Sequence, residues 1–269
     1  MGIINMTPDS FSNDGLYGRR NYIDRALRKA LSQVKEGADV IDIGGESTRP
    51  GSKPISEKEE IQRIIPLIER LAKKINIPIS ADTYKPEVAK RALDAGTTII
   101  NNIMGVKNNR SLLKMVKNYN AAIVLMHIHG TPRTMQKSIY YKDLLKDIIN
   151  SLRNSIEKCL EIGINSDRII IDPGIGFGKT FDHNLTLINN LEKFNILKKP
   201  ILTGTSRKSF IGKILNKPAE DRLFGSIASM CACLMKGAHI VRVHDVKESK
   251  DAATIVDSIL NESPHVMIL

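Results

Sequence analysis

Eight short apolar runs, rich in Ile, Val and Ala, are spaced along the chain, and polar residues lie at or just beyond the end of each. The runs lie at residues 2–6, 40–44, 78–82, 98–101, 121–126, 169–172, 200–204 and 239–243. Continuous apolar runs are typical of strands that are buried on both faces, as in parallel sheets. The pattern therefore predicts eight parallel strands with polar groups at their carboxyl ends.

A segment with helical periodicity follows every run. These segments span residues 22–36, 57–74, 86–95, 110–118, 141–162, 182–194, 218–236 and 248–261. Ser56 stands before the second segment with Glu59 three positions on, which is a capping-box signature. Gly37, Gly163 and Gly237 follow three of the segments, where a left-handed cap is expected.

Eight strand–helix repeats predict an α/β fold, namely a (β/α)8 TIM barrel. A doubly wound open sheet is the alternative arrangement. No linker or change of composition divides the chain, so residues 1–269 are expected to form a single domain. The first run begins at residue 2. We therefore expect that no segment before the first strand closes the floor of the barrel in this sequence, either because it is missing or because the protein has none. In such a barrel the carboxyl ends of all strands meet at one mouth, which is where the chemistry takes place.

The formal net charge of +11 would suit a nucleic acid or an anionic substrate. The lysines are scattered over nearly every predicted helix, however, and form no basic stripe with interleaved aromatic residues, so no nucleic-acid partner is expected. No apolar run reaches about 18 residues, so no membrane span is expected. The three cysteines lack metal-ligand or redox spacing and are typical of a protein of the reducing cytoplasm.

Basic residues follow the last two strand runs, where phosphate sites often form in this fold. Arg242 and His244 alternate around Val243, so both are expected to point to the same side of the strand. Arginine offers a planar fork of donors to a phosphate group. Arg207 and Lys208 follow the seventh run and add two further cations. The alternative for these two is that they cap strand ends or pair with acidic residues.

Three polar groups suit a heterocycle that carries hydrogen-bond donors and acceptors. Asp82, Asn101 and Asp172 each end a predicted strand. A carboxylate accepts two N–H donors from a guanidine-like ring edge, and an asparagine matches a mixed edge. Buried carboxylates need a partner, so the alternative is that these groups pair with Arg or Lys within the barrel mouth.

Two loops contribute further candidates. Thr48 and Arg49 follow a Gly-Gly pair after the second strand, where the backbone can approach a ligand closely. The glycine-rich segment 174–180 does not fit a nucleotide-binding loop, because Pro173 and Lys179 stand where glycines are required. We expect this segment to be a flexible lid, with Phe177 able to cover an aromatic ligand.

The alternating pair His127 and His129 could suggest a metal site. No third ligand is spaced for it, so zinc is not expected.

With these motifs in place, the chain resembles the bacterial dihydropteroate synthases over essentially its full length. The matching segments are 5–12, 42–51, 82–83, 101, 126–127, 130–132, 172–179, 206–209 and 242–246. The pterin-binding domains of folate-dependent methyltransferases, which share the barrel and the Asp and Asn positions, are the alternative. They are not expected to carry the Thr-Pro-Asp-Ser-Phe-Ser, Ser-Arg-Lys-Ser and Arg-Val-His segments together, and no second domain for cobalamin is expected here.

The resemblance implies that the enzyme transfers a pterin-methyl group. It condenses 6-hydroxymethyl-7,8-dihydropterin diphosphate with 4-aminobenzoate to give 7,8-dihydropteroate and diphosphate in folate biosynthesis, through a transfer that we expect to be dissociative. Mg²⁺ and a homodimer are also implied.

Roles for individual residues follow from the same resemblance. The pterin would be held by Asp82, Asn101, Asp172 and Lys208, with Met126 and Gly204 lining its slot. Asn5 would ligate Mg²⁺, and the diphosphate would be taken by Thr48, Arg49, Arg242 and His244. The aminobenzoate would be bordered by Ser209, Phe177 and Pro50. The residues expected to take part in catalysis are Asp82, Lys208, Arg242 and His244. Lys208 is thus expected to face the pterin rather than a phosphate.

The chain departs from the family pattern at two positions, each of which removes a negative charge. Asn13 stands in the first loop where the family usually has Asp, and Asn102 stands at the end of the fourth strand where Asp is usual. For the dimer, the segments 218–236 and 248–261 are the expected interface. Ala228, Met230, Ala232 and Leu234 widen the apolar face of the first, although the same stripe could serve only as core.

Overall fold

The computed structural model describes residues 1–8, 15–18, 21–49, 51–106 and 109–262. All eight predicted strands are confirmed. They are β1 (Gly2–Asn5), β2 (Ile41–Gly44), β3 (Ile79–Asp82), β4 (Ile99–Asn102), β5 (Ala122–Met126), β6 (Ile169–Asp172), β7 (Leu202–Thr203) and β8 (Ile240–Val241). The last two are shorter than the runs that predict them, because their outer residues join neighbouring strands only through isolated bridges.

A helix follows each strand. The α-helices are α1 (Tyr22–Lys35), α2 (Glu57–Ala72), α3 (Pro86–Asp94), α4 (Arg110–Asn118), α5 (Leu144–Ile162), α6 (Phe181–Asn189), α7 (Ser209–Leu215), α8 (Leu223–Met235) and α9 (Val246–Leu260). Short 3₁₀ helices occupy Ser166–Arg168, Leu191–Leu197 and Ala219–Asp221. The sequence pattern did not predict α7, and the segments expected at 182–194 and 218–236 each begin or end in a 3₁₀ turn instead of running on as one helix.

Local signals at the helix ends act as expected. The Ser56 hydroxyl accepts a hydrogen bond from the Glu59 amide at the start of α2. Gly163 ends α5 in the left-handed conformation, with φ of 88°, and Gly37 and Gly237 also have positive φ.

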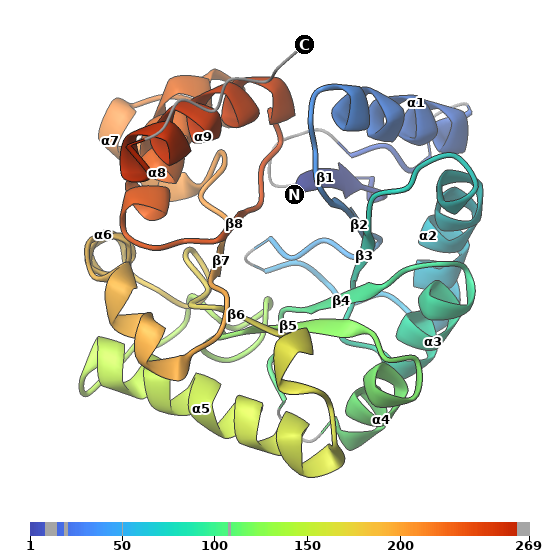
Figure 1. Ribbon diagram of the computed structural model, residues 1–269, viewed down its shortest axis with the longest axis horizontal. Coiled ribbons are helices and arrows are strands. Elements are labelled where there is room, and N and C mark those ends of the chain that lie inside the picture. The colour runs from blue at the N-terminus through green and yellow to red at the C-terminus, as the bar shows by residue number, and fades with distance from the viewer. Residues whose placement is uncertain (9–14, 19–20, 50, 107–108, 263–269) are drawn as a thin grey trace.

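The strands form a closed parallel ring surrounded by helices (Figure 1). Strands β1 to β6 pair in chain order, and β7 pairs with β8. Two isolated parallel bridges join these sets, one between Ile171 and Ile201 and one between Gly2 and Val243. The amide of Ile3 donates to the carbonyl of Val243 at 3.0 Å across the second seam. The predicted (β/α)8 barrel is therefore confirmed, and the doubly wound alternative is wrong.

The two faces of the strands bury different side chains. Ile41 and Ile43 are fully buried in the large core between sheet and helices. Asp42, between them, points into the barrel, because side chains alternate along a strand. Deeper in the barrel a small apolar cluster contains Ile99, Val124 and Leu202, together with Met1. Apolar residues thus fill the lower barrel interior, and polar residues are concentrated toward the mouth.

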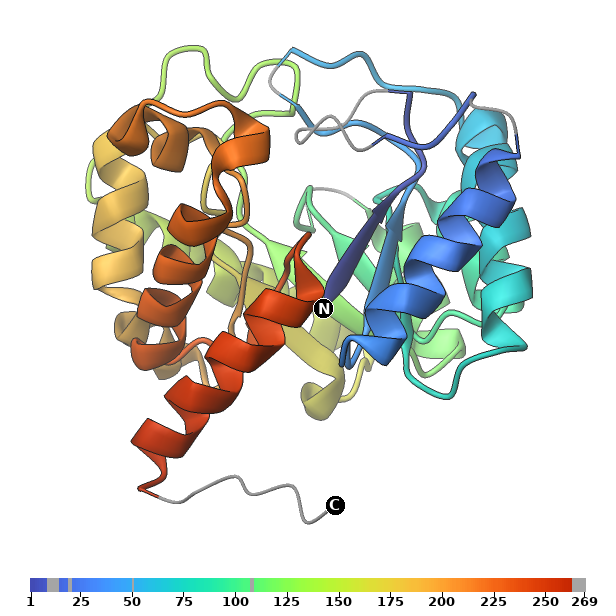
Figure 2. The same ribbon diagram turned by 90° about the horizontal axis from the view of Figure 1, so that it is seen from above.

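The loops that leave the carboxyl ends of the strands gather on one side of the molecule (Figure 2). Within the part of the chain that the structure describes, no helix is long and apolar enough to cross a membrane. The three cysteines are free thiols, and Cys159 and Cys233 are buried.

Candidate active site at the barrel mouth

A cavity opens at the carboxyl ends of the strands and encloses about 880 Å³, including its open mouth. Twelve of the fourteen residues that the sequence singles out line it: Asn5, Thr48, Arg49, Asp82, Asn101, Met126, Asp172, Phe177, Gly204, Lys208, Arg242 and His244. Ser209 does not line the cavity; it is exposed at the first turn of α7. Pro50 lies outside the described residues.

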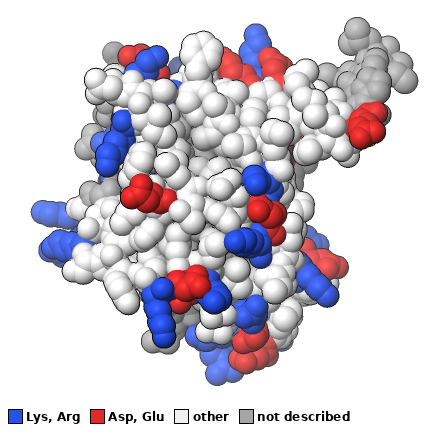
Figure 3. Space-filling model, turned by 90° about the vertical axis from the view of Figure 1, so that its left-hand side faces the viewer, with Lys and Arg blue, Asp and Glu red and all other residues white. Residues whose placement is uncertain are grey.

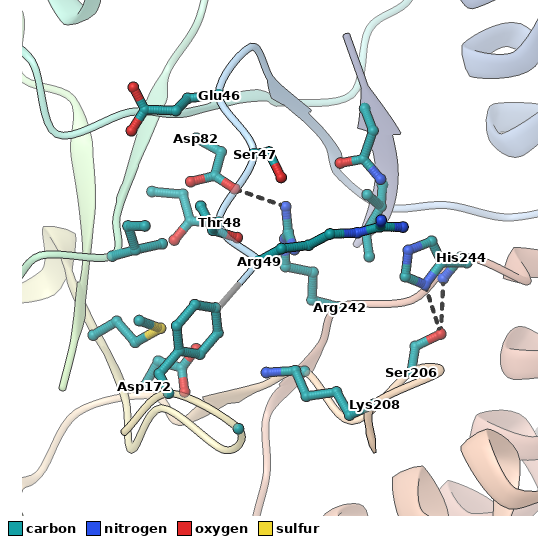
Figure 4. Close-up of a pocket in the computed structure, with 18 of the residues that line it drawn as sticks. Glu46, Ser47, Thr48, Arg49, Asp82, Asp172, Ser206, Lys208, Arg242 and His244 are labelled. Atoms are coloured by element: carbon teal, nitrogen blue, oxygen red, sulfur yellow. Dashed lines mark hydrogen bonds and ion pairs between the residues drawn. The ribbon is translucent and has the colours of Figure 1, made fainter. Parts of the chain in front are cut away.

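Arg242 connects two carboxylates from across the ring. Its Nε donates to Asp42 Oδ2 at 2.6 Å, and its Nη2 donates to Asp82 Oδ2 at 2.9 Å (Figure 4). Asn101 Nδ2 also donates to Asp42 Oδ2, at 3.2 Å. The alternative that the strand-end carboxylates pair with a cation inside the mouth is thus confirmed for Asp82. The same arginine still lines the cavity, so pairing does not remove it from the site.

Burial dominates the electrostatics of Asp82. Its side chain is 11% exposed. Loss of hydration raises the pKa of this carboxyl to about 7, although the nearby Arg242 guanidinium acts in the opposite direction. Burial thus favours the neutral form of Asp82, whereas the contact with Arg242 favours the ionised form.

Asp172 and Lys208 form the opposite wall of the cavity. Burial raises the pKa of Asp172 and the Lys208 ammonium lowers it. Burial also lowers the pKa of Lys208 to about 8, and the charge of Asp172 acts against that change. Lys208 Nζ donates to the carbonyl of Ile175 and lies 4.3 Å from the centre of the Phe177 ring. Lys208 thus faces the side of the cavity that Asp172 and Phe177 line.

His244 lies on the side of the cavity formed by the last strands. Its Nδ1 is 2.9 Å from the Ser206 hydroxyl, and its backbone amide donates to the same oxygen at 3.2 Å. The long side chain of Arg49 extends toward this side from the second loop (Figure 4). Arg49 and His244 thus bring a guanidinium and an imidazole to one side of the cavity, and Thr48 adds a hydroxyl to its wall near Asp82.

Arg207 does not line the cavity with these residues. It adopts a left-handed backbone conformation with φ of 57° and pairs with Asp245. For this residue the structural alternative, pairing with an acidic group, is confirmed.

A buried ionic cluster holds the second loop beside the cavity. Lys85 Nζ contacts Glu46 at 2.5 Å and Glu60 at 2.6 Å, and it donates to the carbonyl of Ile55. Glu46 also accepts from the Tyr84 hydroxyl at 2.8 Å and from the Ile55 amide at 2.9 Å. These contacts hold Glu46 in one position, and Glu46 in turn fixes the start of the segment that carries Thr48 and Arg49.

The glycine-rich segment after β6 is held in place rather than left as a flexible lid. Hydrogen bonds from Lys179, Lys208 and Tyr141 reach its carbonyls. Phe177 packs beside the apolar residues Ile103 and Met126. The expectation that Phe177 can cover an aromatic ligand is compatible with this position, but the expectation of flexibility is not.

The sequence pattern did not single out Asp42, Ser206 or Glu46 as site residues. Asp42 lies in the middle of its run, between two outward isoleucines, and strict alternation would have placed it inside the barrel. Ser206 directly precedes the basic residues Arg207 and Lys208. The side chain of Ser206 lines the cavity and that of Arg207 does not, and the sequence pattern does not distinguish the two.

Of the two departures from the family pattern, Asn13 lies outside the described residues. Asn102 is buried, with its Nδ2 donating to the Gly105 carbonyl at 2.8 Å and its Oδ1 accepting from the Met104 amide at 3.0 Å. It therefore shapes the loop after β4 and does not line the cavity.

The donor set can be tested for the expected magnesium. Among the residues that the structure describes, no three His, Cys, Asp or Glu side chains gather to hold a metal ion. Mg²⁺ usually keeps several waters and is bound through few protein groups together with substrate phosphates. A single amide oxygen from Asn5 at the cavity wall fits that mode of binding and does not fit a cage formed by protein alone.

Comparison with known proteins gives one consistent family. The family model described as pterin binding enzyme matches residues 1–244. The chain is 46% identical to the dihydropteroate synthase of Bacillus subtilis, over 97% of this chain and 88% of that protein. It is 41% identical to the dihydropteroate synthase of Escherichia coli K12, over 97% and 91%.

Solved structures agree. The Yersinia pestis dihydropteroate synthase with a sulfonamide drug complex has a TM-score of 0.93 at 41% identity, covering 97% of this chain and 94% of that one. The Xanthomonas albilineans dihydropteroate synthase with 4-aminobenzoic acid has a TM-score of 0.88 at 36% identity, covering 97% and 92%.

The cluster around Lys85 predicts a large effect of one substitution on stability. In Lys85→Met two buried carboxylates lose their cation, so we expect the free energy of unfolding to fall by about 3–5 kcal/mol. The matched control is Lys90→Met, since Lys90 forms an exposed pair with Asp94, and its loss should change the free energy of unfolding far less than Lys85→Met does. Urea denaturation followed by circular dichroism measures both. Equal losses would show that Glu46 and Glu60 do not depend on Lys85.

Proposed function

The chain belongs to the pterin-binding enzyme family as a dihydropteroate synthase, and we propose that its barrel mouth divides that reaction among a pterin pocket, a diphosphate site and an aminobenzoate site. In the reaction the amine nitrogen of 4-aminobenzoate bonds to the methylene carbon of the pterin. The carbon–oxygen bond to the diphosphate breaks, the diphosphate leaves with the electron pair, and the amine loses a proton. The observation that carries this assignment is the gathering of both required charge types in one cavity.

The pterin pocket is formed by Asp82, Asn101, Asp172 and Lys208. The carboxylates accept N–H donors of the ring edge, and the amide and ammonium groups match its other positions. Asp82 and Asp172 are also negative neighbours for the positive charge that develops at the methylene carbon as the diphosphate departs. Met126 and Gly204 line the slot between them. The combination of acidic and basic groups supports a neutral, polar heterocycle as ligand.

The diphosphate site combines Thr48, Arg49, Arg242 and His244. Their hydroxyl, guanidinium and imidazole groups stabilise the charge that accumulates on the leaving group. Asn5 would hold Mg²⁺ beside them, and the ion would supply further neutralisation of the departing diphosphate. Arg242 has a second function here, because it also pairs with Asp82 and so links the diphosphate site with the pterin pocket.

The aminobenzoate site is proposed at the outer side of the pterin slot. Phe177 supports it, since its ring lies at the cavity wall beside Met126. Ser209 lies next to Lys208 at the exposed start of α7, where it would border the outer rim.

A turnover assay tests the function directly. With 4-aminobenzoate, the pterin diphosphate and Mg²⁺, the enzyme should release diphosphate and form dihydropteroate together. Asp82→Asn should lower kcat/KM for the pterin diphosphate roughly 10- to 100-fold, because a charged hydrogen-bond acceptor is lost. Asp251→Asn on exposed α9 is the matched control. Methyl transfer from a reduced folate without diphosphate release would instead favour the methyltransferase alternative.

The pKa of Asp82 predicts how binding depends on pH. The carboxylate is ionised above about pH 7, so affinity for a pterin should weaken as pH falls below 7, approaching tenfold per pH unit. Lys208, with a pKa of about 8, is already protonated in this range and cannot cause the loss. Calorimetry with 6-hydroxymethylpterin avoids titration of a phosphate group. Asp82→Asn should bind more weakly with a flatter profile, and an unchanged profile would contradict the assignment.

We also propose that residues 1–269 act as one cytoplasmic domain within a homodimer. The three free thiols support a reducing compartment. Met230 and Leu234 are buried, so half of the stripe expected at the interface is core. A different apolar surface is exposed, formed by Ile214, Leu215, Phe224, Met235, Ile255, Ile259 and Leu260 of α7, α8 and α9. Charged side chains are sparse in the upper part of this side of the molecule (Figure 3).

Phe224 is 80% exposed and offers the sharpest test of the dimer. A carboxylate inside an apolar interface is costly to bury, so Phe224→Asp should shift the protein from dimer to monomer in sedimentation equilibrium. Tyr140→Asp is the control, because Tyr140 is 75% exposed and lies on the segment between β5 and α5, outside α7, α8 and α9. A wild-type monomer, or an unchanged dimer in Phe224→Asp, would contradict the proposed face.

A further inference from the structure

The segment between β6 and α6 is bound through its carbonyl groups. The carbonyls of Gly174 and Phe177 accept from Lys179 Nζ at 3.1 Å and 2.8 Å. The Ile175 carbonyl accepts from Lys208, and the Gly178 carbonyl accepts from the Tyr141 hydroxyl at 2.8 Å. Three side chains from three different parts of the chain thus fix a segment whose glycines alone would leave it free to adopt many conformations.

Lys179 is the centre of this arrangement. It is 3% exposed, and its amino nitrogen lies 3.0 Å from His127 Nδ1 as well as beside the two carbonyls. A buried amino group is costly unless hydrogen bonds compensate it. Burial lowers the pKa of Lys179 to about 7. Both the ammonium and the neutral amine keep two N–H donors for Gly174 and Phe177, so the tether persists on either side of neutral pH.

The segment packs tightly on the loop after β5. A Cβ atom on Gly174 would lie 1.9 Å from the His127 carbonyl oxygen, and one on Gly178 would lie 2.6 Å from His129 Cβ. Both glycines have positive φ. The backbone therefore lies directly against residues 127–129, and Lys179, which reaches His127, joins the two loops at their contact.

The position of this segment sets three groups of the cavity. Phe177 lines the cavity, and its ring lies under the Lys208 amino group. The Gly174 amide donates to Asp172 Oδ1 at 2.7 Å, which orients that carboxylate. Lys208 itself is anchored on the Ile175 carbonyl. A displacement of the backbone at residues 174–177 would therefore move all three together.

We propose that Lys179 is a positioning residue for the pterin slot: by holding the carbonyls of Gly174 and Phe177, it keeps Phe177, Asp172 and Lys208 in the geometry that binds the pterin. The proposal rests on the proposed function, because it names a further residue for the same site. Lys179 does not line the cavity, so it acts through the backbone and through Phe177.

An isosteric pair of substitutions separates hydrogen bonding from packing. Lys179→Met removes every donor, whereas Lys179→Gln has a similar length and keeps an N–H donor. We expect Lys179→Met to raise KM for the pterin diphosphate about tenfold while kcat changes less than about threefold, and Lys179→Gln to raise KM less than half as far. Lys137→Met, at an exposed position of the β5–α5 segment, should change neither constant.

A double-mutant cycle with Phe177→Ala tests the path of the effect. If Lys179 acts through the position of Phe177, Lys179→Met should raise KM only about threefold or less when Phe177 is already absent. A general loss of stability would give the same factor in both backgrounds, and thermal melting measures that contribution separately. Should Lys179→Met fail to fold, the same cycle with Lys179→Gln decides, since it too must be less than additive.

The outcomes distinguish the two proposals. Absence of dihydropteroate formation by the unaltered enzyme would overturn the proposed function itself. Normal turnover with an unchanged KM in Lys179→Met, equal KM values for the Met and Gln variants, or an additive cycle would overturn only the role of Lys179.

Discussion

The contacts of Arg242 with Asp42 and Asp82 are the interactions on which the mouth of the barrel depends. Asp42 is fully buried and Asp82 nearly so, and ionised carboxylates cannot remain there without a cation. The cation comes from the residue that follows β8, and the carboxylates come from β2 and β3. The last strand is thus tied electrostatically to the strands that the chain forms early, across the interior of the ring. In the proposed function, pterin recognition and leaving-group stabilisation share this one guanidinium.

Much of this arrangement can be predicted from the sequence. Strands buried on both faces leave continuous apolar runs, so their order and their polar ends are visible without a structure. Orientation is not. Arg207 and Lys208 are adjacent and alike in charge, yet the left-handed backbone at Arg207 turns one toward Asp245 and leaves the other in the cavity. A positive φ at a single residue other than glycine leaves no mark in composition or periodicity.

Helix α7 shows a second limit of prediction from the sequence. Its seven residues include Gly212, which lowers helix propensity, and they follow the strand-end loop without a side-chain cap. The Gly212 position is occupied closely by Arg222, whose guanidinium would lie 2.1 Å from an added Cβ. The helix exists because tertiary packing supports it, and such support is not visible in a single local window. Asp42 differs from α7, because the alternation that places its side chain inside the barrel is a local signal. The two flanking isoleucines make the run look uniformly apolar, so Asp42 was not recognised as a site residue.

The two seams of the barrel divide the active site into parts of unequal stiffness. Asp82, Asn101 and Asp172 end strands of the continuous six-stranded sheet, whereas Ser206, Lys208, Arg242 and His244 follow β7 and β8, which meet that sheet only at isolated bridges. Local opening requires the least free energy where the fewest backbone hydrogen bonds must break. Local opening is therefore expected to begin in the half that carries Arg242 and His244, and Lys208 extends the proposed pterin pocket across the seam into that half. A substrate that fills the proposed pterin and diphosphate sites would touch both parts, and cleavage would end that connection across the seams.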